Sequence, residues 1–381
     1  MARPSSANPE AARIAELAQR FVPVRVTDLR PLDLERFRFD FDLTFAAMTL
    51  APDGRVLHRY GGRDERDAQS HLSMASLAKL LQGTLAELAE TEAAAKPAAV
   101  KPAADAASAG RTIEQLPTFR KRDAEKRVEC VHCHTVNDFE MKQAIEDGRW
   151  RREQMWNFPD PARLGLEVDR DDQQQVAKVV EGSPAARAGV HAGDRLLRAQ
   201  QTPLLTRADL QWALQQLPFE GATLELEVER SVHAFRAPPN ESVDLDERHA
   251  VHLELPAGWK VAPPLEYAWR PYKWNVPPQP GFGGKLLTAE EKRALGLDPN
   301  GYAEKITYLV TWGEKADTGR NAQKAGLRKD DVLLSLAGKT DFVSEDHVQA
   351  WFRLTQRPGT TIDIVLLRDG KRVTVTMPVI E

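Results

Sequence analysis

Hydrophobic positions in the first part of the chain change between the spacing of a helix and that of a strand. Apolar residues three and four positions apart predict helices, and short apolar runs bounded by turn residues predict strands. The predicted elements are a helix at 10–20, strands at 21–26, 43–50 and 55–60, and a helix at 73–88. Pro52-Asp53-Gly54 supplies the turn of a hairpin, because proline presets φ and glycine accepts a positive φ. Residues 1–92 therefore form a small α/β module.

Two later stretches repeat one pattern at a spacing of about 140 residues, which predicts a tandem domain. Each contains a hydrophobic-glycine-hydrophobic triplet, a strand, a short helix of small residues, an aspartate before an apolar strand, and an amphipathic helix. The triplets are Leu164-Gly165-Leu166 and Leu295-Gly296-Leu297. Glycine at the centre allows the backbone to turn its N–H groups toward an anion. Both triplets are therefore candidate anion-binding loops.

Low-complexity and aromatic stretches separate these modules. Residues 93–110 are rich in Ala, Pro and Lys and predict a flexible linker. Residues 233–285 predict a connector that contains an alternating strand at 251–255 and a Pro-rich run with five Trp and Tyr residues. Packing between the repeated domains, or a ligand platform, would each explain these aromatic residues.

Composition narrows the classes of function. The 381 residues are 42% hydrophobic and 28% charged, as in ordinary globular proteins. A net charge of −4 argues against nucleic acid as a partner. No apolar run is long enough for a transmembrane segment. The first residues contain no apolar core of a signal peptide.

The two cysteines of the chain lie in one pentapeptide, Cys130-Val131-His132-Cys133-His134. This C-x-x-C-H spacing is the attachment signature of c-type haem. The thiols of Cys130 and Cys133 would bind the porphyrin vinyl groups, and His134 would be the axial ligand of the iron. A redox dithiol at the two cysteines and a zinc site that adds the histidines are alternatives. A helix is expected to follow, from about Asn137 to Asp147.

Several stretches together resemble a known family. Residues 7–29 and 39–64, the latter ending in Tyr60-Gly61-Gly62-Arg63-Asp64, resemble thioredoxin-like modules of bacterial proteins that also contain PDZ domains, some of them selenoproteins. A Cys-x-x-Cys-His segment and PDZ repeats follow the module in that group. The stretch at 183–197 is similar to the PDZ domains of bacterial envelope proteases. The strand and helix that hold the redox pair of a thioredoxin fold have no counterpart here, which suggests a reading frame begun downstream of its true start.

The resemblance implies a fold and a function. The expected fold is α+β and multidomain, a partial thioredoxin-like α/β module followed by two PDZ-like β-barrel or sandwich domains. The predicted segments are 1–92, the thioredoxin-like module; 93–110, the linker; 111–158, the C-x-x-C-H segment; 159–232, the first PDZ-like domain; 233–285, the connector; and 286–381, the second PDZ-like domain. The expected function is redox-associated binding of peptides or proteins in the bacterial cell envelope, with no catalytic residues assigned.

Two other functions remain open from the sequence. A thiol-disulfide oxidoreductase would act on envelope proteins through Cys130 and Cys133, and a scaffold would carry no chemistry. Periplasmic or extracytoplasmic localisation requires a signal peptide at a true N-terminus that precedes this sequence. In a PDZ domain an extended peptide adds as a strand, here beside 166–168, and its carboxylate binds at the glycine loop.

Overall fold

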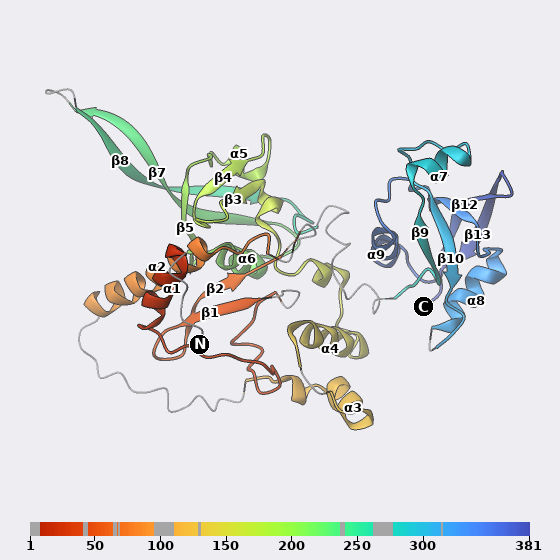
Figure 1. Ribbon diagram of the computed structural model, residues 1–381, viewed down its shortest axis with the longest axis horizontal. Helices are drawn as coiled ribbons and strands as arrows, with labels where there is room; N and C mark the ends of the chain where they lie inside the picture. Colours follow the sequence, from red (N-terminus) through yellow and green to blue (C-terminus); the bar gives the residue numbers. More distant parts are fainter. Residues whose placement is uncertain are drawn as a thin grey trace. The chain divides into compact units, whose positions relative to one another are not determined.

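The computed structural model describes residues 8–40, 45–63, 67, 69–94, 110–128, 131–236, 241–261, 277–313 and 315–381. The chain forms two compact units, Met1–Val261 and Ala262–Glu381, which are described separately (Figure 1). The first unit contains α1 (Pro9–Ala18), β1 (Ala46–Leu50), β2 (Val56–Gly61), α2 (Met74–Ala94), α3 (Pro117–Glu125), α4 (Cys133–Glu146), β3 (Leu166–Val168), β4 (Val176–Val179), α5 (Pro184–Arg187), β5 (Arg195–Ala199), β6 (Thr202–Pro203), α6 (Arg207–Gln216), β7 (Ala222–Arg236) and β8 (Glu241–Leu255). Its described residues also form the 3₁₀ helices η1 (Ile113–Gln115), η2 (Arg152–Trp156) and η3 (Pro161–Leu164).

The N-terminal part confirms the predicted helices and hairpin. Asn8 caps α1 through its side chain, and β1 and β2 pair antiparallel across the turn at Gly54, which has φ +80°. The strand predicted at 21–26 is wrong. Its backbone pairs with no described strand, and Val22 and Val24 are 89% and 80% exposed. Alternating apolar residues form a strand only when a neighbouring strand accepts and donates their backbone hydrogen bonds. A thioredoxin-like module is not shown and stays a prediction.

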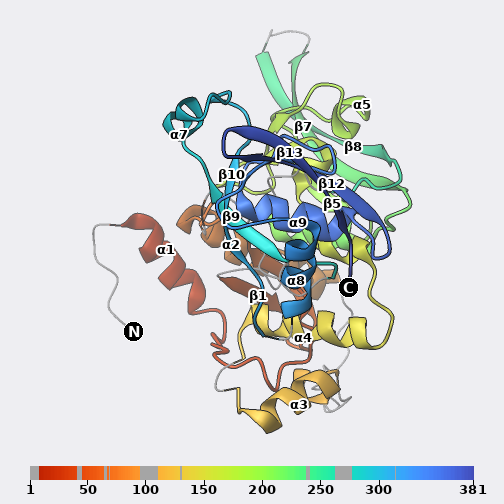
Figure 2. The same ribbon diagram turned by 90° about the vertical axis from the view of Figure 1, so that its right-hand side faces the viewer.

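The helix after the C-x-x-C-H motif begins earlier than its sequence predicts. Cys133 is the first residue of α4, whereas the capping pattern placed the start near Asn137. The helix ends at Glu146, close to the predicted end, and Gly148 follows with φ +64°. Helices α3 and α4 lie side by side (Figure 1, Figure 2). They share a core with the segment around Leu29 and Leu34.

The remainder of the first unit forms two small sheets round one core. Strands β3 and β4 pair antiparallel, and the second sheet has the order β6-β5-β7-β8. An isolated bridge between Gln175 and Arg195 connects β4 to β5. Strand β8 includes the alternating residues 251–255, and the side chains of Leu253 and Leu255 are buried in this core. This strand therefore belongs to the first unit, although the sequence placed it in a connector. The four aromatic residues between 262 and 276 lie outside the described residues.

The second unit is a five-stranded antiparallel sheet in the order β13-β12-β11-β10-β9. Its elements are β9 (Phe282–Leu286), α7 (Ala289–Ala294), β10 (Glu304–Leu309), α8 (Ala316–Ala325), β11 (Val332–Leu336), α9 (Glu345–Thr355), β12 (Thr361–Arg368) and β13 (Lys371–Pro378). Helix α9 lies beside β9 (Figure 1). The domain begins before residue 286, where the sequence placed its start, because β9 opens at Phe282.

The internal repeat extends to individual hydrogen bonds. In the first unit Arg230 forms two hydrogen bonds of 2.6 and 2.7 Å with the Asp194 carboxylate and donates to the Gly189 carbonyl. In the second unit Arg368 makes the same contacts with Asp331 and Gly326, each 2.7 Å long. Asp194 and Asp331 are 1% and 3% exposed, so these paired bonds satisfy buried charge. The part of the first unit from β3 to β7 and the second unit therefore share this local arrangement of aspartate, arginine and glycine carbonyl.

Candidate peptide-binding grooves

The predicted loop of the first unit has the expected backbone geometry. Gly165 has φ +80° and ends the 3₁₀ helix η3, and its carbonyl accepts a hydrogen bond of 2.9 Å from Val180 N–H. A Cβ at this position would collide with the Ser183 side chain, which caps α5. The Gly165 N–H itself donates to the Ala162 carbonyl. The glycine thus fixes a tight loop, with Leu164 and Leu166 buried on either side of it.

The strand after this loop has one open edge. Val180 N–H donates to the Gly165 carbonyl, and Asp169 N–H donates to the Gln175 carbonyl. Because backbone groups alternate in direction along a strand, the N–H and C=O groups of Leu166 and Val168 point away from β4. No described strand pairs with that edge. We call the space between this edge and α6 the first groove.

Helix α6, the wall of the first groove, is held by a buried histidine. His58 on β2 is 0% exposed, and its Nδ1 lies 2.9 Å from Asp209 on α6. Its Nε2 lies 2.7 Å from Glu87 on α2. Burial alone lowers the pKa of His58, but hydrogen bonds with Asp209 and Glu87 outweigh that effect and raise the pKa to about 9. The imidazolium therefore joins three elements at neutral pH.

The neighbouring residue strengthens the same junction. Arg59 N–H donates to the other Asp209 oxygen at 2.8 Å, and the Arg59 guanidinium lies 4.0 Å from the centre of the Trp212 ring. The Thr206 hydroxyl, which caps α6, donates to the Arg59 carbonyl. Burial lowers the pKa of Arg59 to about 10. The N-terminal hairpin thus covers one side of the helix.

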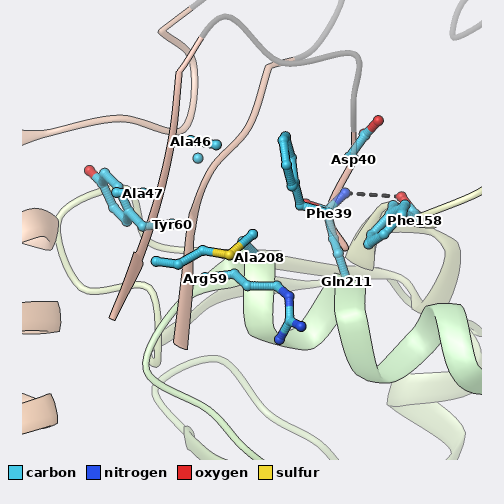
Figure 3. Close-up of a pocket in the computed structure, with 11 residues that line it drawn as sticks. Phe39, Asp40, Ala46, Ala47, Arg59, Tyr60, Phe158, Ala208 and Gln211 are labelled. Carbon is cyan, nitrogen blue, oxygen red and sulfur yellow. Dashed lines mark hydrogen bonds between the residues drawn. The ribbon is translucent and has the colours of Figure 1, made fainter. Parts of the chain in front are cut away.

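Glutamine side chains hold the segment that leads into the loop. Gln211 donates to the Phe158 carbonyl at 3.0 Å, and Phe158 N–H donates to the Gln215 side chain at 2.6 Å. Figure 3 shows the Gln211 bond at the edge of a cavity of about 20 Å³ that Phe39, Tyr60 and Ala208 also line. Such a volume holds about one water molecule. The cavity is therefore a packing gap between hairpin and helix.

The loop equivalent to Gly165 in the second unit is Gly281. Gly281 has φ +77°, its carbonyl accepts from Val310 N–H at 2.8 Å, and its Cβ position is occupied by the backbone of α8. The positive φ and the bond to the carbonyl match those of Gly165, while the Cβ position meets the Ser183 side chain in the first unit and helix backbone in the second. The predicted triplet Leu295-Gly296-Leu297 instead ends α7, where Gly296 has φ +69° in a helix-terminating turn. The placement of this triplet before the groove strand was therefore wrong, because the same three-residue pattern also terminates helices.

The second groove, between β9 and α9, is bridged by its own side chains. Gln349 on α9 donates to the Phe282 carbonyl at 2.8 Å. That carbonyl points away from β10, because Gly281 next to it faces β10. The Tyr308 hydroxyl donates to Glu345, the first residue of α9, at 2.9 Å and passes over Gly283. An added strand would have to displace both bonds.

The C-x-x-C-H motif is described in part. Cys130 lies outside the described residues. Cys133 is half-buried beside the core that contains Val131 and Val136, while His134 is exposed on the first turn of α4. The His134 ring stacks on His132 with centroids 6.0 Å apart. Among the described residues, no three His, Cys, Asp or Glu side chains are grouped to hold a metal ion.

Two features of the grooves were missed in the sequence. His58 is separated from Asp209 by 151 positions, and no local spacing indicates that they meet. The Pro280-Gly281-Phe282 stretch differs from the hydrophobic-glycine-hydrophobic triplet because proline stands at its first position. The order of Gly281 before a strand, as in the first repeat, was the signal that would have found it.

Comparisons with known proteins identify a domain family in the first unit. Residues 162–236 match the model of the PDZ domain family. One similar solved structure is the HtrA-type protease AlgW with decapeptide, which is 17% identical over 42% of this chain and 49% of that chain, with a TM-score of 0.22. Another is the same protease with tripeptide, which is 17% identical over 41% of this chain and 52% of that chain, with a TM-score of 0.21. The chain thus spans about half the length of these proteins. No curated protein matches it. Among the described residues, no helix has the length and apolarity to cross a membrane. From the family match, the first unit contains a PDZ domain, a module that binds peptides or proteins.

Proposed function

We propose that the chain binds a peptide or protein partner by adding an extended segment to the outer edge of β3. The observation that supports this function is the unpaired edge of Leu166 and Val168 within the matched PDZ domain. Backbone hydrogen bonds to this edge would supply affinity. The loop at Gly165 would receive a terminal carboxylate.

Basic side chains stand near this loop. Arg163, two positions before Gly165, donates to the Val261 carbonyl at 3.3 Å. Lys260, the preceding residue, donates from Nζ to the Gln215 carbonyl at the end of α6, at 3.1 Å. Burial lowers the pKa of Lys260 to about 8. A carboxylate bound at the loop would lie near the positive charge of Arg163, two positions away in the chain.

A proline on the strand edge tests the mode of binding. Val168→Pro removes one outward N–H and leaves the β4 ladder complete, because proline is tolerated where its nitrogen faces solvent on an edge strand. We expect C-terminal peptides selected from a displayed library to lose about tenfold in affinity, measured by fluorescence anisotropy. Val168→Ala is the matched control, since it keeps the N–H and shortens the side chain.

Two results would contradict the function. The first is a selected peptide that binds Val168→Pro and the parent chain equally well. The second is a library that yields no binder at all. If a peptide with a free C-terminus and its amidated form bind equally well, strand addition would still hold, but the loop at Gly165 would not bind the carboxylate.

We also propose that the C-x-x-C-H segment gives the chain a redox function in the cell envelope. Cys130 and Cys133 would hold c-type haem through thioethers, and the exposed His134 imidazole would be its axial ligand. Bound haem supplies one-electron transfer. The test is expression with cytochrome maturation factors followed by acid–acetone extraction: haem should stay on the chain and be lost from Cys133→Ala. Thiol exchange that depends on Cys130 without a Soret band would favour the oxidoreductase alternative.

A further inference from the structure

A short segment that follows β8 is fastened to the C-terminal end of α6. The Trp259 indole N–H donates to the Pro218 carbonyl at 2.9 Å, and Lys260 Nζ donates to the Gln215 carbonyl at 3.1 Å. Trp259 is 7% exposed and belongs to the core of the domain. We call residues 258–261 the clasp.

The other end of the clasp is bonded to the opposite side of the first groove. The Val261 carbonyl accepts from Arg163 at 3.3 Å, and Arg163 belongs to η3, which ends at Gly165. The edge of β3 is covered at this end only: Leu166 is 1% exposed, whereas Val168 is half-buried. The Leu166 N–H points away from β4, so its burial shows that the chain itself covers the loop end of the groove.

The clasp is a tight turn that is held at a cost. Gly258 has φ +77°, and its carbonyl accepts from Val261 N–H at 3.0 Å. Lys260 is 8% exposed, and burial lowers its pKa to about 8 against the opposing charge of Glu220. The printed bond of its ammonium is to a neutral carbonyl, and a buried charge is costly without an opposite charge in contact. Release of residues 260 and 261 would return this ammonium to water.

We propose that the clasp is an autoinhibitory contact, which closes the loop end of the first groove until the C-terminal segment of a partner displaces residues 260 and 261. The inference rests on the proposed strand-addition function and adds its regulation. A terminal carboxylate accepts from Arg163 more strongly than the Val261 carbonyl does, because it is charged. The apparent affinity for the partner is therefore reduced by the fraction of chains in which the clasp is closed.

Loosening the turn of the clasp tests this control without changing a residue of the groove. A Cβ at Gly258 approaches no atom closer than 3.9 Å, so Gly258→Ala adds only the strain of a positive φ. It should raise the open fraction, and the affinity for a selected C-terminal peptide, about fivefold by fluorescence anisotropy. Val261→Pro, at a residue that is 39% exposed, removes the N–H that closes the turn and should act in the same direction.

The matched control is Gly193→Ala, an exposed glycine with φ +94° whose Cβ would meet open space. It should leave the affinity unchanged. Hydrogen exchange of the chain without peptide gives a second measurement. The Leu166 amide should exchange about fivefold faster in Gly258→Ala, while the Glu167 amide, which faces β4, should not change.

A clasp that only supports the fold would give the opposite result. Equal or weaker peptide binding by both Gly258→Ala and Val261→Pro would overturn the proposal, as would faster exchange of Leu166 without a gain in affinity. If no peptide binds any of the chains, the strand-addition function fails, and the exchange of Leu166 alone decides the clasp. Unchanged exchange in both variants would then show that residues 258–261 do not cover the loop.

Discussion

The two grooves share a loop, a strand and a helix, yet different chemistry holds the helix in each. The third residue of α6 is Asp209, which pairs with the buried cation of His58. The third residue of α9 is His347, itself buried, whose Nδ1 accepts from Val343 N–H at 3.3 Å. One helix is thus anchored by charge supplied from the N-terminal hairpin, and the other by a neutral imidazole within its own turn. The same fold accommodates both kinds of anchor because the two helices have in common only the apolar faces that pack on their cores.

This difference has a consequence for binding. The anchored α6 leaves the edge of β3 unpaired, while Gln349 ties α9 to the edge of β9. Gln211 occupies the position of Gln349 but donates to Phe158 instead. One glutamine thus holds the approach to the loop in the first unit and bridges the groove in the second. Similar sequence at equivalent positions therefore gives one open edge and one closed edge.

The largest expected effect comes from removing the His58 cation. His58→Leu removes the buried cation that contacts both Asp209 and Glu87, so the first unit should lose roughly 3–5 kcal/mol of unfolding free energy. Urea unfolding followed by hydrogen exchange separates the two units. His252→Leu, a change of an exposed histidine on β8, is the control. An equal loss of unfolding free energy in both units, or no loss in either, would contradict the proposal that His58 anchors only the first unit.

The pH dependence should differ in direction between the units. The pKa of His58 is raised to about 9 when folded, so its stabilising effect is complete below its ordinary value of 6.5 and is lost as pH rises through 9. Burial, with a smaller effect of Lys339, lowers the pKa of His347 to about 4, so its stabilising effect is complete above 6.5 and is lost as pH falls toward 4. Each effect corresponds to roughly 3 kcal/mol.

Hydrogen exchange measured across pH 4 to 10 checks this expectation. Amides of α6 should lose protection on the alkaline side and those of α9 on the acid side. His347→Phe should remove the acid-side loss without changing α6. Parallel loss in both units at either extreme would contradict the assignment of each histidine to its own unit.

The sequence predicted the features that depend on neighbouring residues. The hairpin at Gly54, the capped helix α9 and the turn before Asp194 and Asp331 follow from local spacing, and all appear. The segment 21–26 failed because a strand also requires a partner. The His58 junction and the bonds of the clasp arise from tertiary contacts between distant positions, which periodicity does not encode. The C-x-x-C-H motif can be recognised in the sequence, and the haem that it would attach stays a prediction.

The loop glycines give the next effect in size. Gly165 and Gly189 both have positive φ, but a Cβ at Gly165 meets Ser183, whereas one at Gly189 meets open space. Gly189→Ala should cost about 1 kcal/mol from backbone strain alone, and Gly165→Ala should cost about 2 kcal/mol more because the α5 cap must move. Thermal unfolding measures both.

The smallest effect tests what closes the second groove. Gln349→Ala removes one buried hydrogen bond to the Phe282 carbonyl, which should cost about 1 kcal/mol of stability in the second unit. If that bond keeps the edge of β9 closed, peptides selected for the first groove should gain measurable binding to the second, detected as a second site by calorimetry. The matched change Gln211→Ala should create no new site, because Gln211 contacts Phe158 and not β3. A Gln349→Ala chain with one binding site would show that the Tyr308–Glu345 bond over Gly283 suffices to exclude a strand, and Tyr308→Phe in the same background would then be expected to open it.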